Sequence, residues 1–521
     1  MAICRMNGMS IQRIESRYAI SAKCNLSEDF ARRKMDMAVR NETSRRGFIG
    51  GAAAFAALAG CRNGMHMTSA NHVCEGQKRW YKGNLHMHTF WSDGKAFPEE
   101  AVAWYKSRGY NFIGLSEHNM FQDDPDRWVA VVGDNEAKFT PAWARKPTRR
   151  YVFTVKQRYF DDYLTAFPDA VTRIGAGGRV EARLRTFDEL SRRFNVPGEF
   201  LLLPDVEATR TVQYSDGRVH QLHMNYVNLP RLLPSIASPD FNRMAKDVPI
   251  GKFLGWHAKE VAELSRAMGK SSLFILNHPI WKWYDVGPEA LVENPDVRFF
   301  EVCNNGSPFA PGDNLPTDGF DTDRLWDVVN AFRIRRGMQP LYGIGTDDTH
   351  NYRGEPGAML MPGNAWSLVR AESLDAVSLI DAMNKGDFVT CEGLELDDVS
   401  FDQSTGTLEV SAPPGLSVRT VRFIVTKRDF AEKPIGKVTV RPAHLKDRMD
   451  FLRDINIYDE KIGKTVKTVR FRPGEPVRAS YVMESDDLYV RARIEEKGAT
   501  FCTAPLHPQG VRVAWTQPYR C

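Results

Sequence analysis

The pattern of apolar and polar positions divides the chain into regions that predict different kinds of secondary structure. From Trp80 to about residue 395, short apolar runs alternate with amphipathic stretches. One such stretch begins at Pro98, carries two acids in its first turn and ends at Gly109, which is the pattern of a capped helix. Strand, helix and strand in this order imply parallel strands joined by crossovers. The runs predicted as buried strands are RWYKGNLHMH, NFIGLSEHN, EFLLLPDVEA, LHMNYVNL, SLFILNHP, RFFEVCNN and PLYGIGTDD.

Seven such strands favour an α/β barrel over residues 80–395 rather than a small open sheet. Residues 119–198 interrupt this pattern and are rich in Arg, Asp and aromatic residues. They are expected to form either an inserted, partly helical subdomain over the barrel mouth or a floppy surface insertion. From residue 396 to 521, alternating runs broken by Gly, Pro and Asp predict a C-terminal all-β, sandwich-like domain.

The N-terminal segment TSRRGFIGGAAAFAALAGC has a different character. The pair Arg45–Arg46, a short Ala/Gly-rich apolar run and a small-residue stretch ending in Cys61 follow one another in the order of a twin-arginine lipoprotein signal. The run is about ten residues long, too short to span a bilayer. The prediction is therefore a signal over residues 1–61, a linker over 62–79, and an exported protein, periplasmic or at the cell surface, lipid-anchored to the membrane at Cys61. The alternative is a buried Ala-rich helix.

Charge and cysteine content narrow the possible partners. Residues 1–60 hold 10 of the 70 Lys/Arg and 5 of the 65 Asp/Glu, so the rest of the chain holds 60 of each and is neutral. A neutral chain lacks the basic footprint of a nucleic-acid-binding protein, and no nucleic acid partner is expected. None of the 8 cysteines forms a CxxC pair, so a thiolate metal site is not expected. Cys502 and Cys521 flank the last predicted strand and could be bridged outside the cytoplasm.

Imidazole and carboxylate residues gather where the apolar runs end. The carboxyl ends of parallel barrel strands share one rim, where active sites lie. His86 with His88, and Asp348 with His350, have the two-residue spacing that points both members of a pair the same way on a strand. The nine candidate ligands are His86, His88, Asp93, His118, Glu207, His223, His278, Asp348 and His350. Nine ligands without thiolates exceed one tetrahedral site and predict two or three divalent ions, namely Zn, Mn or Fe.

The ordered motifs HMHTFWSDG, SEHN, DVE, HMN, NHP and DDTH resemble those of the polymerase-and-histidinol-phosphatase (PHP) superfamily. The form GTDDTH and the β-rich tail are most similar to its carbaryl-hydrolase-like branch, the CehA/McbA-type metallohydrolases. The resemblance covers about residues 80–395 and, more weakly, the tail. It implies a distorted (β/α)7 TIM-like barrel of the PHP type, with a site for two or three metal ions.

The resemblance also implies how the ligands are shared among three ions. The first ion would take His86, His88, Glu207 and Asp348. The second would share Glu207 and add His223 and His278. The third would take Asp93, His118 and His350.

Three positions need a decision within this resemblance. Family members often have Thr-Asp-His where this chain has Ser-Glu-His ending at His118. Asp348 is preferred to its neighbour Asp347 because Asp-x-His is the matching spacing. His223 is preferred to His220 because His-x-Asn follows the glutamate motif in this branch-like pattern.

The expected function is that of a metal-dependent hydrolase acting on a small-molecule ester or phosphoester. Its catalytic water would be metal-bound, and no separate protein base is assigned. A phosphoesterase is the first expectation and a carbamate, ester or amide hydrolase the second. An inactive, surface-anchored binding protein is the alternative from another class. Glu301 is expected either to support a ligand or to be a structural rim acid, and Lys282 and Arg353 either to hold an anionic substrate group or to be surface charges.

Overall fold

A computed structural model describes most of the chain beyond residue 77. The described residues are 78–136, 154–215, 217, 219–229, 245–279, 286–304, 321–353, 360–440, 453–497 and 511–521. The predicted signal with Cys61 lies outside them, as do nearly all of the predicted linker, Lys282 and Cys502. Within these ranges, no helix has both the length and the apolar character needed to cross a membrane.

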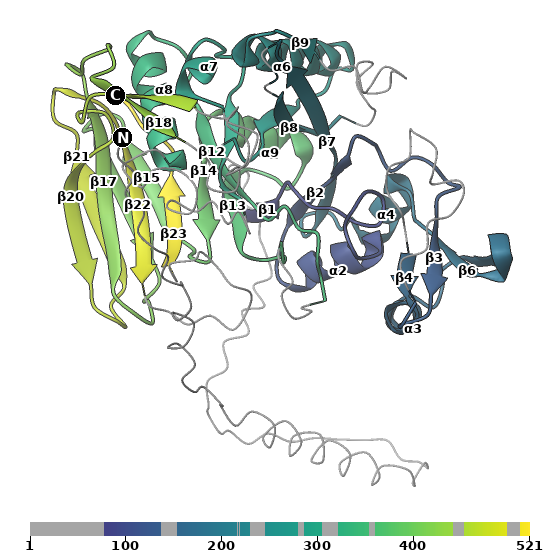
Figure 1. Cartoon of the computed structure of the whole chain (residues 1–521). Coiled ribbons are helices and arrows are strands. Elements are labelled where there is room, and N and C mark those ends of the chain that lie inside the picture. Colours follow the sequence, from purple (N-terminus) through teal and green to yellow (C-terminus); the bar gives the residue numbers. More distant parts are fainter. Residues whose placement is uncertain are drawn as a thin grey trace, which may run out of the picture. The chain divides into compact units, whose positions relative to one another are not determined.

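One large mixed sheet carries the predicted buried strands (Figure 1). Their order in the sheet is β12-β11-β10-β8-β7-β2-β1. Their bounds are β1 Arg79–Asn84, β2 Phe112–His118, β7 Leu201–Gln213, β8 Val219–Val227, β10 Leu273–Leu276, β11 Phe299–Asn304 and β12 Tyr342–Thr346. The short strand β9 (Ala245–Lys246) pairs with β7 outside this order. All seven runs are therefore strands, as predicted.

Six of the seven strands run in the same direction, and β8 is reversed. The pairs β1–β2, β2–β7, β10–β11 and β11–β12 are parallel, whereas β8 is antiparallel to both β7 and β10. This corrects the expectation of uniformly parallel strands. Only residues 214–218 separate β7 from β8, which is enough for a hairpin but too short for a helical crossover.

Helices make the remaining crossovers. Helix α2 (Pro98–Ser107) joins β1 to β2, has Pro98 in its first turn, and is followed by Gly109 with φ of 76°, so the capped helix is confirmed. The crossovers on the other side of β8 are made by α6 (Ile250–Ala267), α7 (Pro288–Val292) and α8 (Thr322–Arg335). Each returns the chain to the same end of the sheet before the next parallel strand begins.

The sheet continues from β1 into the C-terminal region. There β13 (Ala365–Ala371) pairs antiparallel with β1 and is joined by α9 (Ala376–Asn384) to β14 (Phe388–Glu392). Strand β12, at the other end of this strand order, contacts β13 and β14. The backbone N of Gly345 donates to Ser367 Oγ at 3.3 Å, and Thr390 Oγ1 donates to the Gly343 carbonyl oxygen at 2.8 Å. No ladder joins β12 to β13 among the described residues. The observed fold is a mixed α/β sheet, and a closed (β/α)7 barrel is not confirmed.

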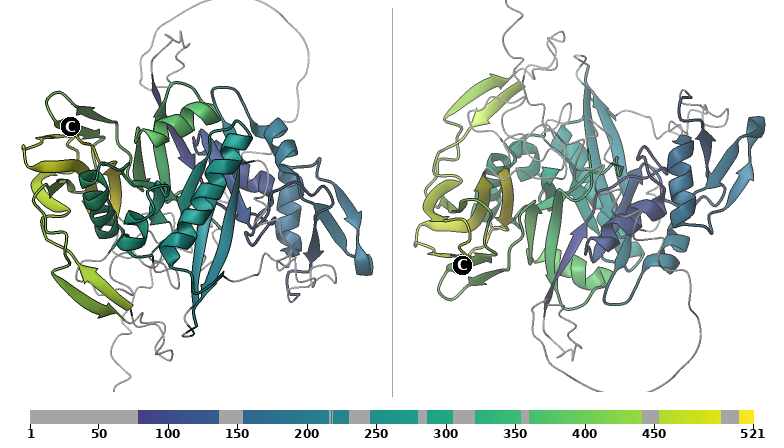
Figure 2. Two further views of the ribbon diagram at one scale, coloured as in Figure 1. Left: turned by 90° about the horizontal axis from the view of Figure 1, so that it is seen from above. Right: turned by 90° about the horizontal axis from the view of Figure 1, so that it is seen from below.

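Beyond β14 the described residues form strands and no helix (Figure 2). The large sheet extends through β23 (Val511–Thr516), β22 (Asp487–Lys497), β17 (Arg419–Lys427) and β20 (Lys464–Phe471). A second sheet contains β15 (Asp398–Asp402), β16 (Thr407–Ala412) and β21 (Val477–Val482), and a separate pair contains β18 (Gly436–Val440) and β19 (Arg453–Ile457). Val410, Val421 and Ile494 of the two larger sheets belong to one apolar core. The C-terminal region is thus joined by a continuous sheet to the region that contains β1–β14.

The predicted insertion is an ordered subdomain within its described residues. Its sheet contains β3 (Trp128–Val132), β4 (Thr154–Lys156), β5 (Thr172–Ile174) and β6 (Val180–Arg183), together with α3 (Gln157–Ala166), η2 (Ala176–Gly178) and α4 (Phe187–Phe194). Tyr163 of α3 stacks on Phe97 with ring centroids 3.7 Å apart, and Trp91 Nε1 donates to the Arg185 carbonyl at 2.9 Å. The described part of the insertion is therefore packed against the loop between β1 and α2.

Candidate metal centre

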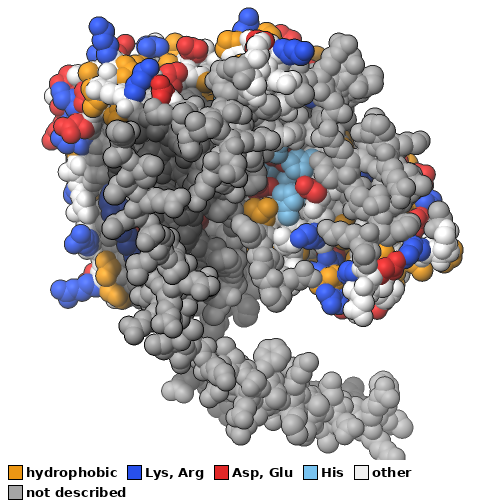
Figure 3. All heavy atoms as spheres, viewed as in Figure 1, with side chains coloured by type: hydrophobic (Ala, Val, Ile, Leu, Met, Phe, Trp, Pro, Cys, Tyr) orange, Lys and Arg blue, Asp and Glu red, His pale blue; other side chains and the backbone are white. Residues whose placement is uncertain are grey.

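The nine candidate ligands form one connected cluster at the end of the sheet where the parallel strands finish. His86 and His88 follow β1, His118 is the last residue of β2, and His278 lies two residues after β10. Glu207 and His223 come from the long strands of the β7–β8 hairpin, where Glu207 pairs with Asn225. In the space-filling view, histidine and acidic side chains are visible at the floor of a hollow (Figure 3). The shared strand direction places these side chains together, as the sequence predicted.

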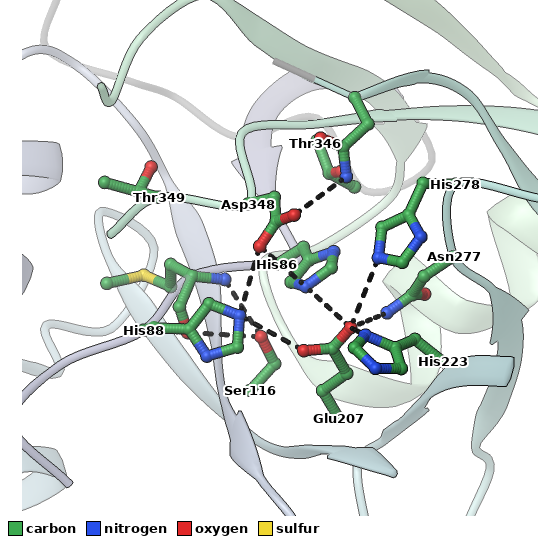
Figure 4. Close-up of polar contacts among 12 residues, drawn as sticks. His86, His88, Ser116, Glu207, His223, Asn277, His278, Thr346, Asp348 and Thr349 are labelled. Carbon is green, nitrogen blue, oxygen red and sulfur yellow. Dashed lines mark hydrogen bonds and ion pairs between the residues drawn. The ribbon is translucent and has the colours of Figure 1, made fainter. Parts of the chain in front are cut away.

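Glu207 lies at the centre of the cluster and is 1% exposed (Figure 4). Its two oxygens contact five imidazoles. Oε1 lies 2.8 Å from His223 Nδ1, 3.3 Å from His86 Nε2 and 3.5 Å from His278 Nε2. Oε2 lies 2.9 Å from His118 Nδ1 and 3.2 Å from His88 Nε2. A carboxylate in this position can be shared by adjacent cations.

Asp348 completes the buried part of the cluster. Its Oδ1 atom lies 3.2 Å from Nε2 of His86 and 3.2 Å from Nε2 of His88. The backbone of Asp348 has φ of 47° and that of His278 has φ of 24°, both in the left-handed region that costs energy for a non-glycine residue. Strain of this kind is found where a side chain has to be aimed at a functional site.

A second group of side chains forms the more exposed rim of the cluster. Asp93 Oδ1 lies 3.2 Å from His350 Nε2, and Asp93 Oδ2 lies 3.6 Å from His118 Nε2. The side chain of Asp93 is 37% exposed and that of His350 is 17% exposed. The turn that carries Asp93 is attached to the His350 loop, because Lys95 N donates to the His350 carbonyl at 2.8 Å.

Opposite charges shift the titration of the buried group. Burial lowers the pKa of His86, but the carboxylates of Asp348, Glu207 and Glu301 outweigh it, and the pKa is raised well above its usual value. Burial raises the pKa of Asp348, yet the neighbouring imidazoles, His86 first, hold it well below its usual range. The carboxylates are therefore anionic ligands over the physiological range.

The pKa values of the other candidate ligands depend on the same balance between burial and neighbouring charges. Burial lowers the pKa of His118, but Glu207 and Asp93 outweigh it and raise the pKa to about 9. Burial raises the pKa of Asp93, but the imidazoles of His118 and His350 hold it well below its usual value. For His223 burial prevails over the nearby Glu207, and its pKa falls to about 4.

The donor set fits divalent cations. His86 Nε2 and His88 Nε2 are buried and make no hydrogen bond, which is costly for polar atoms unless another partner binds them. Ligands about 2.0–2.2 Å from a zinc ion lie roughly 3.3–3.5 Å apart around a tetrahedron. The contacts of 3.2–3.3 Å that join His86 and His88 to Glu207 and Asp348 are close to that spacing. Imidazole and carboxylate donors suit Zn, Mn or Fe.

Three overlapping groups have the geometry to hold an ion. The buried group is His86, His88, Glu207 and Asp348. The rim group is His88, Asp93, His118 and His350. A third group is His118, Glu207 and His223. These groups overlap with the ion sets implied by the resemblance and differ from them in two ways: His88 also belongs to the rim group, and His118 rather than His278 lies with Glu207 and His223 in the third.

Glu301 holds two of the candidate ligands in place. Its Oε1 atom lies 2.6 Å from His86 Nδ1, and its Oε2 atom accepts from the backbone N of His278 at 2.7 Å. Thr346 Oγ1 also donates to Oε1 at 2.6 Å. A carboxylate on Nδ1 leaves Nε2 of His86 as the lone-pair donor toward a metal ion. These contacts favour the expectation that Glu301 supports a ligand.

The structure also distinguishes Asp348 from Asp347, and His223 from His220, as candidate ligands. The Asp347 carboxylate accepts from the backbone N of Gly363, Asn364 and Ala365 at 2.7–2.9 Å, so it holds a loop, while Asp348 faces the cluster. His220 lies beside the Tyr214 ring, with centroids 5.4 Å apart, and is in none of the three groups.

The contacts of Arg353 do not match the substrate-binding role that the sequence suggested as one possibility. Its guanidinium forms an ion pair with Glu100 at 2.7 Å, donates to the Lys95 carbonyl and lies over the Tyr159 ring at 4.6 Å. These contacts attach the loop after His350 to the start of α2. They give no support to the prediction that Arg353 binds substrate.

Two supporting residues are absent from the sequence prediction. Asn277 Nδ2 donates to Glu207 Oε1 at 3.0 Å and to Asn225 Oδ1 at 2.8 Å. Glu117 is fully buried and accepts hydrogen bonds from Thr89 and Ser92 in the turn after β1. Each lies directly before a candidate histidine. Their supporting role could have been inferred from a polar residue at the end of an otherwise buried strand, because a buried polar group needs hydrogen-bond partners.

Comparisons with known proteins give structural resemblances only. No protein-family model matches the chain, and no curated protein matches it. A two-domain protein from Bacteroides vulgatus, described as containing a predicted PHP-like metal-dependent phosphoesterase, is 15% identical with a TM-score of 0.35, covering 84% of this chain and 94% of that one. A metal-dependent phosphoesterase from Bifidobacterium adolescentis and an amidohydrolase from Chromobacterium violaceum are each 14% identical, with TM-scores of 0.25 and 0.24, covering 53% of this chain and 90% of theirs. Because these scores are low, function is inferred from the geometry of the site. That site is a buried cluster of imidazole and carboxylate donors of the kind that binds divalent metal ions, and it is built on a mixed α/β sheet.

Proposed function

We propose that the protein is a metal-dependent hydrolase that uses two or three divalent ions to hydrolyse phosphoesters. The observation that carries this proposal is the Glu207 carboxylate, which is buried and lies within 3.5 Å of five imidazoles. Burying five imidazoles around one carboxylate costs free energy unless cations bind between them. Divalent ions in such a site supply Lewis-acid polarisation of the substrate and activation of water near neutral pH.

The chain's own residues position the reacting groups. Glu207 belongs to both the buried group and the third group, so it would be the ligand that the ions held by these groups share. Glu301 and Asn277 hold His86 and Glu207 in orientation through bonds of 2.6 and 3.0 Å. The rim at Asp93 is the exposed end of the cluster, so substrate is expected to approach from that side.

The charge of the site favours an anionic substrate. The ligand set holds three carboxylates, those of Asp93, Glu207 and Asp348, against two or three dications. The buried Glu301 carboxylate beside His86 adds a fourth negative charge, so two dications would only balance the site, whereas three would leave it net positive. A net positive site attracts a phosphoester and stabilises charge on its oxygens. A neutral carbamate, ester or amide, the expected substrate of the carbaryl-hydrolase-like branch, gains less from that field.

The test is a substrate panel on the full chain loaded with Zn or Mn, containing phosphomonoesters, phosphodiesters and carbamates. Turnover of a phosphoester that is lost in Glu207→Ala and retained in Arg353→Ala is the expected result. Turnover of carbamates alone would replace the phosphoesterase by the alternative. Less than one transition-metal ion per freshly purified chain would overturn the hydrolase and favour a binding protein.

We further propose that the chain is exported and lipid-anchored through Cys61. The support is the order of the twin arginine, the apolar run and Cys61 in the sequence. Metabolic labelling with a fatty acid tests it. Cys61→Ser should abolish the label and release the protein from the membrane fraction, whereas Cys24→Ser should leave both unchanged.

A further inference from the structure

His88 belongs to two of the three candidate groups, and the distances by themselves do not assign it. Its Nε2 atom lies 3.2 Å from both Glu207 Oε2 and Asp348 Oδ1, in the buried group. Its Nδ1 atom lies 3.8 Å from Asp93 Oδ1, in the rim group. A neutral imidazole has one lone-pair nitrogen, so it can bind an ion on one side only.

The decisive neighbours of His88 are Ser92 and Glu117, both fully buried. Ser92 Oγ lies 3.3 Å from His88 Nδ1 and 2.5 Å from Glu117 Oε2. Ser92 Oγ is also 3.4 Å from Asp93 Oδ1, but the bond to Glu117 is shorter by almost an ångström. The single hydroxyl proton of Ser92 therefore points at Glu117.

The other contacts of Glu117 show that it acts as an acceptor. The backbone N of Thr89 donates to its two oxygens at 3.1 and 3.2 Å. Thr89 Oγ1 lies 2.5 Å from Oε1, and the same hydroxyl oxygen accepts from the backbone N of Trp91 at 3.2 Å. Glu117 is thus the acceptor in each of these hydrogen bonds, from the Thr89 backbone and from the Thr89 and Ser92 hydroxyls.

We propose that Ser92 and Glu117 are positioning residues that fix the tautomer of His88, and that this is the tautomer required by the buried ion set that the family resemblance already implies. Because Ser92 gives its proton to Glu117, its oxygen accepts from His88, and the His88 proton resides on Nδ1. Nε2 is then the lone-pair donor, directed at the ion held with Glu207 and Asp348. The rim ion keeps Asp93, His118 and His350. Ser92 and Glu117 act as positioning residues, and this inference rests on the proposed metal site.

His86 shows the same arrangement, but its Nδ1 atom contacts a carboxylate directly rather than through a serine. His86 Nδ1 contacts the Glu301 carboxylate directly at 2.6 Å, and its Nε2 faces the same two carboxylates as His88 Nε2. Two histidines two residues apart are thus oriented toward one ion by different buried carboxylates, one direct and one through a serine. Carboxylate–histidine–metal arrangements of this kind raise metal affinity.

The experiment is NMR of the full chain labelled with ¹⁵N-histidine and loaded with Zn, together with Zn titrations. His88→Gln identifies the His88 ring signals. In the wild type these are expected to show a proton on Nδ1 and Zn on Nε2. Ser92→Ala and Glu117→Gln should weaken binding of the buried ion about 10- to 100-fold and broaden or shift the His88 signals. Ser92→Thr should restore both, because it keeps the hydroxyl, and Glu100→Gln is the matched control that should change neither.

The outcomes separate this inference from the proposed function. A wild-type chain that binds Zn but carries the His88 proton on Nε2 overturns the inference, as does unchanged Zn affinity in Ser92→Ala. A wild-type chain that binds no Zn overturns the proposed function together with it. Should Glu117→Gln unfold, the Ser92→Ala and Ser92→Thr pair, whose folding is checked by thermal unfolding, still decides the question.

Discussion

The two ends of the histidine cluster are built differently. At the buried end, His86 and Glu207 are at most 1% exposed and lie on or directly after strands of the large sheet. At the rim, the side chains of Asp93 and His350 are 37% and 17% exposed and lie in loops after β1 and β12. The buried ligands are thus held by the sheet, whereas Asp93 and His350 at the rim are held by contacts between loops.

This contrast predicts that an ion at the buried end should bind more tightly than an ion at the rim. Charge interactions are stronger away from water, and supporting hydrogen bonds to Glu301 and Asn277 hold the buried ligands in orientation. The rim is open to solvent, so its ion is expected to exchange more readily and to meet the substrate first. A tight buried site and a looser rim site should therefore respond differently to substitution and to pH.

The largest effect is expected from Glu207→Ala. Removal of the central carboxylate leaves five imidazoles without their shared anionic partner, so more than one ion per chain should be lost and activity should fall by roughly 10³-fold or more. Elemental analysis of the purified variant measures the first, and steady-state kinetics the second. Full retention of metal would show that Glu207 is not shared between ions.

A smaller effect is expected from Asp93→Asn. This substitution removes one anionic ligand at the rim and leaves the strand-held group untouched, so about one ion should be lost and activity should fall roughly 10²-fold. Metal titration against a chelator should show the tight ions unchanged. If the tight ions are released as well, the two ends of the cluster do not behave as separate sites.

The pH dependence of metal binding should follow from His118. In the metal-free chain its pKa is raised to about 9, so at pH 7 it carries a proton that an ion has to displace. Affinity for the ion bound by His118 should therefore rise with pH up to about 9, by up to about tenfold per unit, and binding should release a proton. Calorimetry in two buffers of different ionisation enthalpy measures this release, and its absence at pH 7 would contradict the assignment.

The smallest effect is expected from Arg353→Ala. Arg353 pairs with Glu100 at the start of α2 and does not contact the candidate ligands. Loss of this partly exposed ion pair should lower the free energy of unfolding by about 1 kcal/mol or less. Metal content and KM should stay within about twofold of the wild type. A large rise in KM alone would restore the substrate-binding role that the sequence suggested.

Much of the fold follows from local pattern. The buried runs are all strands, and Pro98 and Gly109 bound helix α2 because proline suits the first helical turn and glycine tolerates the left-handed conformation that follows the last. The reversal of β8 was missed because the hydrophobic pattern of a strand carries no direction. The short 214–218 connection was the available signal.

The candidate ligands were accessible to sequence reasoning for a similar reason. His86 and His88 lie just beyond β1 but keep its two-residue spacing, with Met87 between them bridged to Thr349. The shared end of the parallel strands gathers histidines that lie far apart in the chain. The residues that support the ligands were not accessible in the same way. Asn277 and Glu117 look like ordinary polar neighbours of histidines until their bonds to Glu207 and Ser92 are seen.

Local sequence was enough to define the kinds of donor, their spacing along each strand and the end of the sheet at which they lie, since all three depend on residues close together in the chain. Only the tertiary structure decided that Glu207 is central, that Asp348 rather than Asp347 faces the cluster, and that Glu301 orients His86 across a separation of 215 residues. Such contacts depend on strand order, on register and on which side chains become buried together, and these are set by packing of the whole sheet rather than by any local pattern.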